Sequence, residues 1–346
     1  MSNKIGEIVE MNENYADQLI LIDSITSYIH LGIDELNVRN CSSPLIIADF
    51  GSSYEFYSIH IMKTIIEYLR QTNKLVRPPL IVHNDLPIND WTRLFELLAR
   101  DNSYEGVANG RSFYEQCLPP NCLSIGFSSA SLHLLSQKPC NFSNHCYYTF
   151  AEESERQRFK DQSKLDFISF LEHRSRELVS GGVLILIIPS AEKQETMSFN
   201  YYFDLLYKCA QSITFLTPQD LLNYTIPLHL RSLSECVDFE LFERCSFKLI
   251  KAEFSYMKYP IFVRYQNGHI TLDQFAKTLT VIMRTTTELS FKQALEITGR
   301  SKEDIDKILT QFWTLYEETV RNEPFHDDVN TYIVCLILKK VDKVLK

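Results

Sequence analysis

Apolar runs that end in an acidic residue alternate with helix-like stretches in the first half of the chain. The runs 44–51 (PLIIADFG) and 80–85 (LIVHND) are short and mainly apolar, which is typical of strands buried on both faces. Between them, apolar side chains from Ile59 to Leu69 recur at helical spacing. A strand, a crossover helix and a second strand make a βαβ unit, whose strands are parallel. The alternation therefore predicts an α/β fold.

The same alternation continues to about residue 190. The sequence predicts a strand over 123–129 (LSIGFSS), a long helix over 159–179 and a central strand over 183–188 (VLILII). Gly181 and Gly182 are expected to terminate the helix, because glycine is common just beyond a helix end. These elements extend the α/β core.

Beyond residue 190 the pattern becomes mainly helical. Amphipathic patterns cover 205–213, 273–285 and 302–319, a short extended piece lies at 247–254, and strand-like sequence returns at 332–338. We therefore expect three parts. They are an α/β core over 1–190, a helical cap over 191–325 that forms the substrate pocket, and a C-terminal strand within 326–346 that returns to the core sheet.

The charge balance argues against several classes of partner. The chain has 35 Lys and Arg against 44 Asp and Glu, a formal net charge of −9. A general phosphate-backbone binder is therefore not expected, although a local basic groove is compatible with this total. No apolar run approaches the ~18 residues of a membrane span, and the first residues are polar. We expect a cytoplasmic protein that binds neither nucleic acid nor membrane.

The cysteines predict neither disulfides nor a metal site. There are 9, an odd number, scattered along the chain without a CxxC pair. Cys140, His145 and Cys146 are close in sequence but lack further ligands at usable spacing. Buried, reduced thiols are the expected state, and no metal is predicted.

Two acidic residues stand where open α/β sheets bind ligands, beyond the carboxyl ends of the strands. Asp49 precedes Gly51, which would let a ligand approach the backbone, and Asp85 is placed to accept both hydroxyls of a ribose. Either aspartate alone would fit a helix N-cap or a turn, whereas the two together favour a nucleoside. No GxGxxG or GxxxxGK[ST] motif is present to hold phosphates. The predicted cofactor is S-adenosylmethionine, a nucleoside without phosphates.

Five blocks, mostly in the first half of the chain, match in order the motifs of one enzyme family. They are 47–53 (IADFGSS) for IADLGCSSG, 84–91 (NDLPINDW) for NDLPGNDF, 110–114 (GRSFY) for GSFYxRLFP with one residue inserted, 128–139 (SSASLHLLSQKP) for SSYSLHWLSQVP, and 160–182 for DFxxFLxxRxxELxxGG. The chain thus resembles the SABATH family, which transfers a methyl group from S-adenosylmethionine to carboxylic acids or, in some members, to ring nitrogens. The resemblance implies a Rossmann-like class I methyltransferase core with a mainly helical cap.

The resemblance also implies roles for individual residues. Asp49 and the adjoining loop would line the methionine end of the cofactor, Asp85 would bind the ribose, and Phe113 would stack on the adenine. Tyr15, in a segment similar to the family's SYAxNSxxQ, would close over both ligands. The predicted cofactor-binding residues are Tyr15, Asp49, Gly51, Asp85, Leu86, Ser112, Phe113 and Ser128.

The substrate side departs from the family's pattern. The glutamine and tryptophan that hold the substrate carboxylate in carboxyl methyltransferases of the family fall on Ile22 and Leu134. Gln18 is near enough to replace the glutamine, although a surface glutamine without a role is the simpler interpretation. His229 stands in place of a tyrosine, and His133 matches the family's histidine, for which a structural core histidine is the alternative. The predicted substrate-binding residues are Tyr15, Gln18, Ala130, His133, Leu134 and His229.

Methyl transfer to a carboxylate needs no general base, because the acceptor is already ionised near neutral pH. Orientation and exclusion of water are then the enzyme's contribution. His133 and His229 are candidates to hydrogen-bond the carboxylate, or to act as base if the acceptor is a nitrogen. We expect a methyltransferase that esterifies a small apolar carboxylic acid, releases S-adenosylhomocysteine and, as the resemblance implies, forms a homodimer. An N-methyltransferase of the same family and a cofactor-binding or interaction protein without activity are the alternatives.

Overall fold

One seven-stranded sheet with the order β3-β2-β1-β4-β5-β7-β6 forms the centre of the molecule. The computed structural model describes residues 2–37, 44–53, 56–101, 103–191, 199–323 and 329–342, with side chains from residue 19 onward. Strands β1 to β5 are parallel, and β7 is antiparallel to both β5 and β6. The strands are β1 (Ile46–Phe50), β2 (Leu80–Asp85), β3 (Glu105–Gly110), β4 (Leu123–Ser129), β5 (Leu178–Pro189), β6 (Phe247–Lys258) and β7 (Asn330–Lys340).

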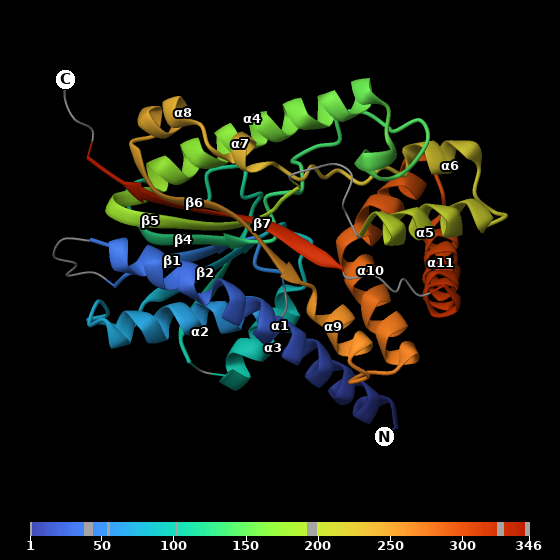
Figure 1. The fold of residues 1–346 in the computed structure, drawn as a ribbon, viewed down its shortest axis with the longest axis horizontal. Coiled ribbons are helices and arrows are strands. Elements are labelled where there is room, and N and C mark those ends of the chain that lie inside the picture. Colours follow the sequence, from blue (N-terminus) through green and yellow to red (C-terminus); the bar gives the residue numbers. More distant parts are fainter. Residues whose placement is uncertain are drawn as a thin grey trace.

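Helices cover both faces of this sheet, so that the core has three layers (Figure 1). One layer contains α1 (Ser2–Glu35), α2 (Phe56–Gln71) and α3 (Trp91–Asp101). The opposite layer contains α4 (Glu153–Glu177), α7 (Leu233–Cys236) and α8 (Phe239–Arg244). The predicted α/β class and the crossover helix between β1 and β2 are confirmed.

The central strand β5 is apolar on both faces because both faces are covered. Val183, Ile185 and Ile187 pack in the core on the α1 and α2 side. Leu184 and Leu186 pack in the core on the α4 side. Alternate side chains of a strand point to opposite faces, so a continuous apolar run is what a doubly covered strand requires.

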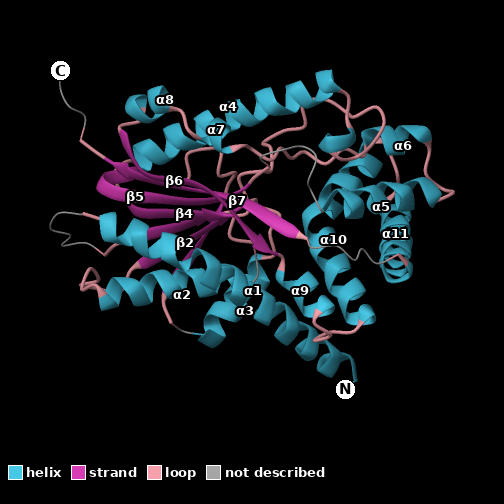
Figure 2. Ribbon diagram, in the orientation of Figure 1, coloured by secondary structure: helices cyan, strands magenta, loops and turns pink. Residues whose placement is uncertain are grey.

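A second group of helices lies beyond the carboxyl ends of the parallel strands, at one end of the sheet (Figure 2). It has an aromatic-rich core of its own, in which Tyr224, Phe291 and Phe312 are fully buried. We call this group the cap. Its helices are α5 (Phe199–Ser212), α6 (Pro218–Asn223), α10 (Leu272–Ile297) and α11 (Lys302–Asn322), with α9 (Pro260–Gln266) and the short helix η1 (Tyr148–Phe150) packed beside them.

Two expectations about the elements need correction. Gly181 and Gly182 do not terminate a helix: α4 ends at Glu177, and Gly181 lies within β5 at φ 81°. The pairing of β4 with β5 shifts register between Leu123 and Ile125, so these glycines belong to a bulged strand start. The extended piece at 247–254 is part of β6, which pairs with β7 in the sheet and not with the cap. The boundaries at residues 190 and 325 stay a prediction.

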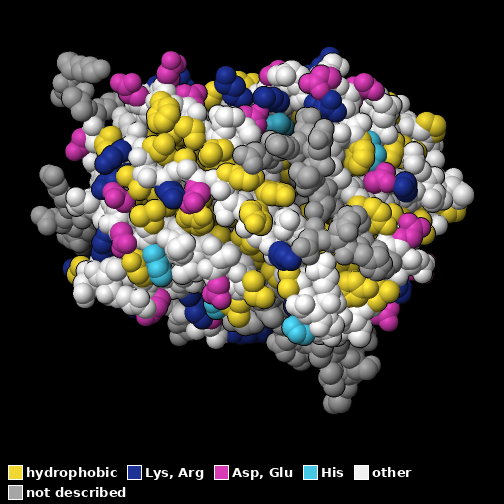
Figure 3. All heavy atoms as spheres, viewed as in Figure 1, with side chains coloured by type: hydrophobic (Ala, Val, Ile, Leu, Met, Phe, Trp, Pro, Cys, Tyr) yellow, Lys and Arg dark blue, Asp and Glu magenta, His cyan; other side chains and the backbone are white. Residues whose placement is uncertain are grey.

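The surface drawn in Figure 3 carries apolar side chains across its middle and charged side chains toward its edges. Within the described part of the chain, no helix combines the length and apolar character needed to cross a membrane. Over the same residues, no three His, Cys, Asp or Glu side chains gather in a metal-binding arrangement, and this includes Cys140, His145 and Cys146.

Candidate active site

The turn after β1 is fastened to the end of β2. The amide nitrogens of Gly51 and Ser52 both donate hydrogen bonds to the carbonyl oxygen of Asn84, at 2.8 and 3.0 Å. Gly51 adopts φ 85° and Ser53 φ 54°, a left-handed conformation that aims successive amides toward one side. A Cβ atom on Gly51 would lie 2.1 Å from Ser131 Oγ, so only glycine fits there. The turn is therefore a rigid, backbone-lined edge.

Asp85 is oriented by the same turn. Its Oδ2 accepts a hydrogen bond from the amide of Ser53 at 2.7 Å, and its Oδ1 accepts one from the amide of Leu86 at 2.7 Å. Each carboxylate oxygen keeps lone pairs for a further donor. Burial raises the pKa of Asp85, and the two amide hydrogen bonds oppose that rise. Leu86, the residue expected against the adenine, is 41% exposed beside it.

Asp49 lies at the end of β1 and starts a buried hydrogen-bonded chain. Ser58 Oγ donates to Asp49 and also contacts His83 Nδ1 at 3.1 Å, and His83 Nε2 contacts the hydroxyl of Tyr104 at 3.1 Å. Burial raises the pKa of Asp49 to about 7, the Ser58 hydrogen bond lowers it, and the charge of Asp85 raises it further. Burial lowers the pKa of His83 to about 4, so this ring is neutral near pH 7.

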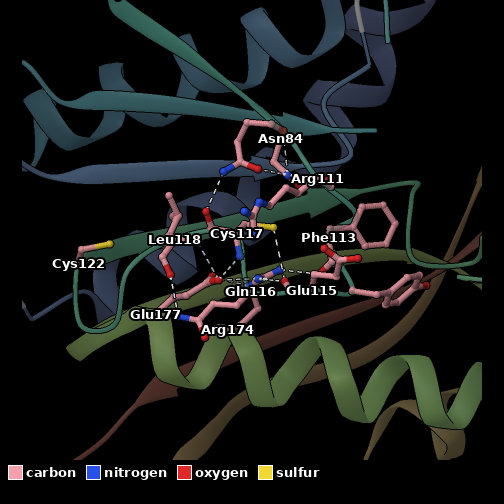
Figure 4. Close-up of polar contacts among 12 residues, drawn as sticks. Asn84, Arg111, Phe113, Glu115, Gln116, Cys117, Leu118, Cys122, Arg174 and Glu177 are labelled. Carbon is pink, nitrogen blue, oxygen red and sulfur yellow. Dashed lines mark hydrogen bonds and ion pairs between the residues drawn. The ribbon is translucent and has the colours of Figure 1, made fainter. Parts of the chain in front are cut away.

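The segment from Arg111 to Leu118 follows β3 and lies next to this turn; we call it the 111–118 loop. Asn84 Nδ2 donates to the carbonyl oxygen of Arg111 at 2.9 Å (Figure 4). A Cβ on Gly51 would be 3.6 Å from Phe113 Cε1, which places this ring directly beside the turn. Ser112 and Phe113, which the resemblance places against the adenine, both have half-buried side chains in this loop.

The geometry fits a nucleoside cofactor. Glycine at position 51 leaves the room that a close ligand needs, and Asp85 offers paired acceptors for a diol. Ser52 Oγ is buried in the turn and has no hydrogen-bond partner among the described residues, which is how a hydroxyl that awaits a ligand would stand. We conclude that the residues present match S-adenosylmethionine.

The serines at the end of β4 and just after it have mainly structural contacts. Ser128 Oγ donates to the carbonyl oxygen of Phe50 at 2.8 Å and is 1% exposed. Ser129 Oγ contacts the hydroxyl of Tyr57 at 3.0 Å, and Ser131 Oγ donates to Gly51 O at 3.2 Å. Tyr57 and Ser131 were not singled out from the sequence, although Ser131 lies inside the matched block 128–139. Ala130 is exposed between them at φ 54°.

The two candidate histidines lie side by side. Leu134 and Leu228 form an isolated antiparallel bridge between the segment after β4 and the cap. Across it, the amide of His229 donates to the carbonyl oxygen of His133 at 2.8 Å. Burial lowers the pKa of His133 to about 4, and the nearby charge of Arg231 lowers it further, so its ring is neutral near pH 7.

His229 has an acidic neighbour. Its Nε2 lies 3.5 Å from Glu235 Oε1, and Lys160 Nζ lies 3.1 Å from the same oxygen. Burial would raise the pKa of Glu235, but the neighbouring His229 ring and the hydrogen bond from the amide of Ser232 hold it below the usual range. One ring nitrogen of His229 thus faces a carboxylate of the protein itself.

Arg231 was not singled out from the sequence, yet it is the most unusual charge near this bridge. Its side chain is 1% exposed. Nη1 donates to the carbonyl oxygen of Leu132, Nη2 donates to that of Ser163 at 2.7 Å, and Nε has no partner among the described residues. Among the described residues this buried guanidinium contacts carbonyl groups and no carboxylate, so it leaves a net positive charge whose effect reaches His133.

Three positions named in the sequence analysis belong to α1. Tyr15 and Gln18 belong to α1, but their side chains lie outside the described ones. Ile22, the position aligned with the family's glutamine, is 2% exposed in the core between α1 and the sheet.

Residues 12–341 match the family model of the SAM-dependent carboxyl methyltransferases. The chain belongs to this family. The resemblance seen in its motifs is thereby confirmed, and so, at the level of the family, is S-adenosylmethionine as the cofactor.

Curated relatives agree with this placement. A probable S-adenosylmethionine-dependent methyltransferase of Arabidopsis thaliana is 29% identical over 236 residues, which cover 60% of this chain and 65% of that protein. A farnesoic acid carboxyl-O-methyltransferase of the same plant is 27% identical, over 61% of this chain and 69% of the relative. A loganic acid O-methyltransferase of Catharanthus roseus is 28% identical, over 54% of this chain and 55% of the relative. The aligned region thus spans about two thirds or less of most of these relatives.

A solved structure confirms the fold. A loganic acid methyltransferase with SAH superimposes with a TM-score of 0.77 at 20% identity, covering 96% of each chain. The predicted class I methyltransferase fold with a helical cap is correct.

Proposed function

We propose that the protein transfers the methyl group of S-adenosylmethionine to the carboxylate of a small apolar acid, giving a methyl ester and S-adenosylhomocysteine. The observation that carries this proposal is the buried guanidinium of Arg231, next to the carbonyl oxygen of Leu132 and without a carboxylate partner among the described residues. In a site of low polarity such a charge favours an anionic acceptor over a neutral one.

The residues of the chain would act by binding and orienting. When bound, the cofactor supplies an electrophilic methyl group, and an ionised carboxylate attacks it without a base. Asp85 and the turn at Gly51 would hold the nucleoside. The neutral ring of His133 would donate a hydrogen bond to the acceptor carboxylate, while Leu134 and the cap core would exclude water.

The test is a methyl-transfer assay with labelled S-adenosylmethionine. The acceptors include farnesoic, loganic, benzoic and salicylic acids, because relatives bear those substrates in their names, together with nitrogen heterocycles. We expect label in an organic-extractable product that alkali hydrolyses, as it does an ester. A base-stable product would indicate N-methylation. Binding of S-adenosylhomocysteine without any product would instead indicate a cofactor-binding protein that has lost catalysis.

Arg231→Met tests the carrying observation directly. Removing the charge should raise KM for the acid by about tenfold, the effect of losing a moderate electrostatic interaction. The affinity for S-adenosylhomocysteine should stay unchanged, because Arg231 contacts the segment Leu132–His133 and not the turn at Gly51. An unchanged KM would contradict the assigned role of Arg231.

We further propose that the protein is a homodimer and acts in the cytoplasm. Resemblance to the family supports the first statement, and the 9 scattered cysteines without a CxxC pair, which favour reduced thiols, support the second. Light scattering after gel filtration would give twice the 40.4 kDa chain mass for a dimer. Imaging of a tagged full-length chain would test the location.

A further inference from the structure

A fully buried ion pair lies where α4 meets β5. Arg174 Nε donates to Glu177 Oε2 at 2.7 Å and Nη2 donates to Glu177 Oε1 at 2.8 Å, and neither side chain is exposed. We propose that this pair positions the 111–118 loop, so that Phe113 is held where the adenine of the cofactor binds. The inference rests on the proposed placement of the adenine against Ser112 and Phe113.

Both members of the pair hold the backbone of this loop (Figure 4). Arg174 donates from Nη1 to the carbonyl oxygen of Phe113 at 2.7 Å, and from Nη2 to that of Glu115 at 2.9 Å. Glu177 Oε1 accepts hydrogen bonds from the amides of Cys117 at 2.6 Å and Leu118 at 3.0 Å. Two charged side chains one helical turn apart thus fix four backbone groups of one irregular segment.

The same guanidinium connects the loop to the cofactor turn. Its Cζ lies 4.0 Å from the ring centroid of Phe50, the residue before Gly51, and 5.0 Å from that of Phe170. The rings of Phe113 and Phe170 are 6.2 Å apart in an edge-to-face arrangement. The loop carrying Phe113 and the turn at Gly51 are therefore packed against one cation.

Simple stabilisation does not explain the choice of these residues. A buried ion pair commonly stabilises a fold no better than apolar side chains of the same volume, and its better-attested role is to specify one arrangement. Here the pair uses planar, bidentate geometry to select a single path for the loop. A weaker, uncharged contact comes from the same helix, where Ser169 Oγ donates a hydrogen bond to the carbonyl oxygen of Tyr114 at 3.0 Å.

The experiment measures the affinity for S-adenosylhomocysteine by calorimetry, together with thermal unfolding, on the full-length chain. Glu177→Gln keeps the volume but cannot accept from both amides and the guanidinium. Arg174→Lys keeps the positive charge but lacks the planar guanidinium that donates to both oxygens of Glu177. We expect both variants to lower the affinity for S-adenosylhomocysteine by about tenfold. If the pair only stabilised the fold through its charge, Arg174→Lys would keep the wild-type affinity for S-adenosylhomocysteine.

The matched control is the ion pair between Arg300 and Asp220 in the cap, where Nη2 lies 2.6 Å from Oδ2 and the Asp220 side chain is unexposed. Arg300→Met should lower the unfolding temperature but leave the affinity for S-adenosylhomocysteine within about twofold. Equal weakening in this control would overturn the positioning role, because a general loosening of the fold would then account for the loss.

Phe113→Ala separates the failure of this inference from that of the proposed site. If Phe113→Ala lowers the affinity for S-adenosylhomocysteine while Glu177→Gln and Arg174→Lys do not, the proposed adenine site is supported and the positioning role is contradicted. If Phe113→Ala has no effect, both fall. Should the two pair variants not fold, Ser169→Ala decides: we expect about threefold weaker binding, and unchanged affinity overturns the proposal.

Discussion

The amide nitrogen of His229 donates a hydrogen bond to the carbonyl oxygen of His133 at 2.8 Å. This contact joins the segment after β4 to the cap, next to the turn that carries Gly51. This backbone hydrogen bond places residues 133 and 229 opposite each other beside the bridge between Leu134 and Leu228. Nδ1 of His133 and both ring nitrogens of His229 lack a hydrogen-bond partner among the described residues, but Nε2 of His229 lies 3.5 Å from Glu235 Oε1.

That difference predicts unequal effects of removing the two rings. His133→Phe should raise KM for the acid by about tenfold, because a hydrogen bond to a charged acceptor is lost. His229→Phe should change KM by no more than about threefold, since its Nε2 is directed at Glu235. Steady-state kinetics with the best acid of the panel, with S-adenosylhomocysteine affinity as the control, measures both. If neither variant changed KM or turnover, no role in substrate binding would remain for these histidines.

Gly51→Ala should abolish cofactor binding. A Cβ would lie 2.1 Å from Ser131 Oγ and 2.4 Å from its Cβ, and φ is +85°. The turn would have to move, so we expect S-adenosylhomocysteine to bind at least about 100-fold more weakly. Gly299→Ala is the control, because φ is +78° there but nothing lies within 4 Å of the added Cβ. It should cost about 1–2 kcal/mol of stability and leave affinity unchanged. Equal affinities of the two variants would contradict the steric argument.

Asp85→Ala should weaken the binding of S-adenosylhomocysteine by about 100-fold, because the charged, oriented carboxylate that we propose as acceptor of the ribose hydroxyls is lost. Asp85→Asn, which keeps one acceptor oxygen, should fall between this variant and the wild type. Asp90 offers a neighbouring control: its Oδ1 accepts from the amide of Arg93 at 3.0 Å as a helix cap. Asp90→Ala should cost about 1 kcal/mol of unfolding free energy and no affinity. The measurement is calorimetric titration of the folded variants. If the ribose binds elsewhere, Asp85→Ala will have the same affinity for S-adenosylhomocysteine as the wild type.

The strands that carry the site were predictable because they are buried on both faces. Apolar runs such as 183–188 leave little ambiguity, and the acidic residues at their ends mark the ligand edge. Strand β3 (EGVANG) was not predicted, because it lies at the sheet edge, is half exposed and has no apolar run. Gly181 was misassigned because a glycine serves equally in a helix end and in a bulge.

The contacts that shape the site could not be predicted from one sequence. Arg174 reaches the carbonyl oxygen of Phe113, and Arg231 reaches that of Leu132, across large separations in the chain. Arg231 stands in no motif quoted from the sequence, and Arg174 occupies the arginine of the matched block 160–182, a position that does not by itself separate a buried guanidinium from a solvated one, since arginine is usually exposed. Only the assembled fold brings these charges to the loops that they hold.

The last prediction concerns pH. Burial raises the pKa of Asp49 from 3.8 to about 7, and Asp85 is the charged neighbour that adds to this rise; the tyrosines at 57 and 104 and the ring of His83 are neutral there. Asp49 is therefore protonated below about pH 7 and anionic above it. The resemblance to the family implies that the methionine end of the cofactor lies at Asp49, where its ammonium group would favour the anion.

The affinity for S-adenosylhomocysteine should accordingly fall as the pH is lowered from 8 to 6, by up to about tenfold per pH unit below the pKa of Asp49. The stability of the ligand-free protein changes in the opposite direction. Because the folded pKa of Asp49 lies above its usual value of 3.8, its contribution to stability is fully present below about pH 4 and is lost as the pH rises from there to about 7. Calorimetry at pH 6 in two buffers of different ionisation enthalpy should detect a proton released on binding. Asp49→Asn should remove both the proton release and the pH dependence. A pH-dependent affinity that persisted in this variant would assign the titration to another group.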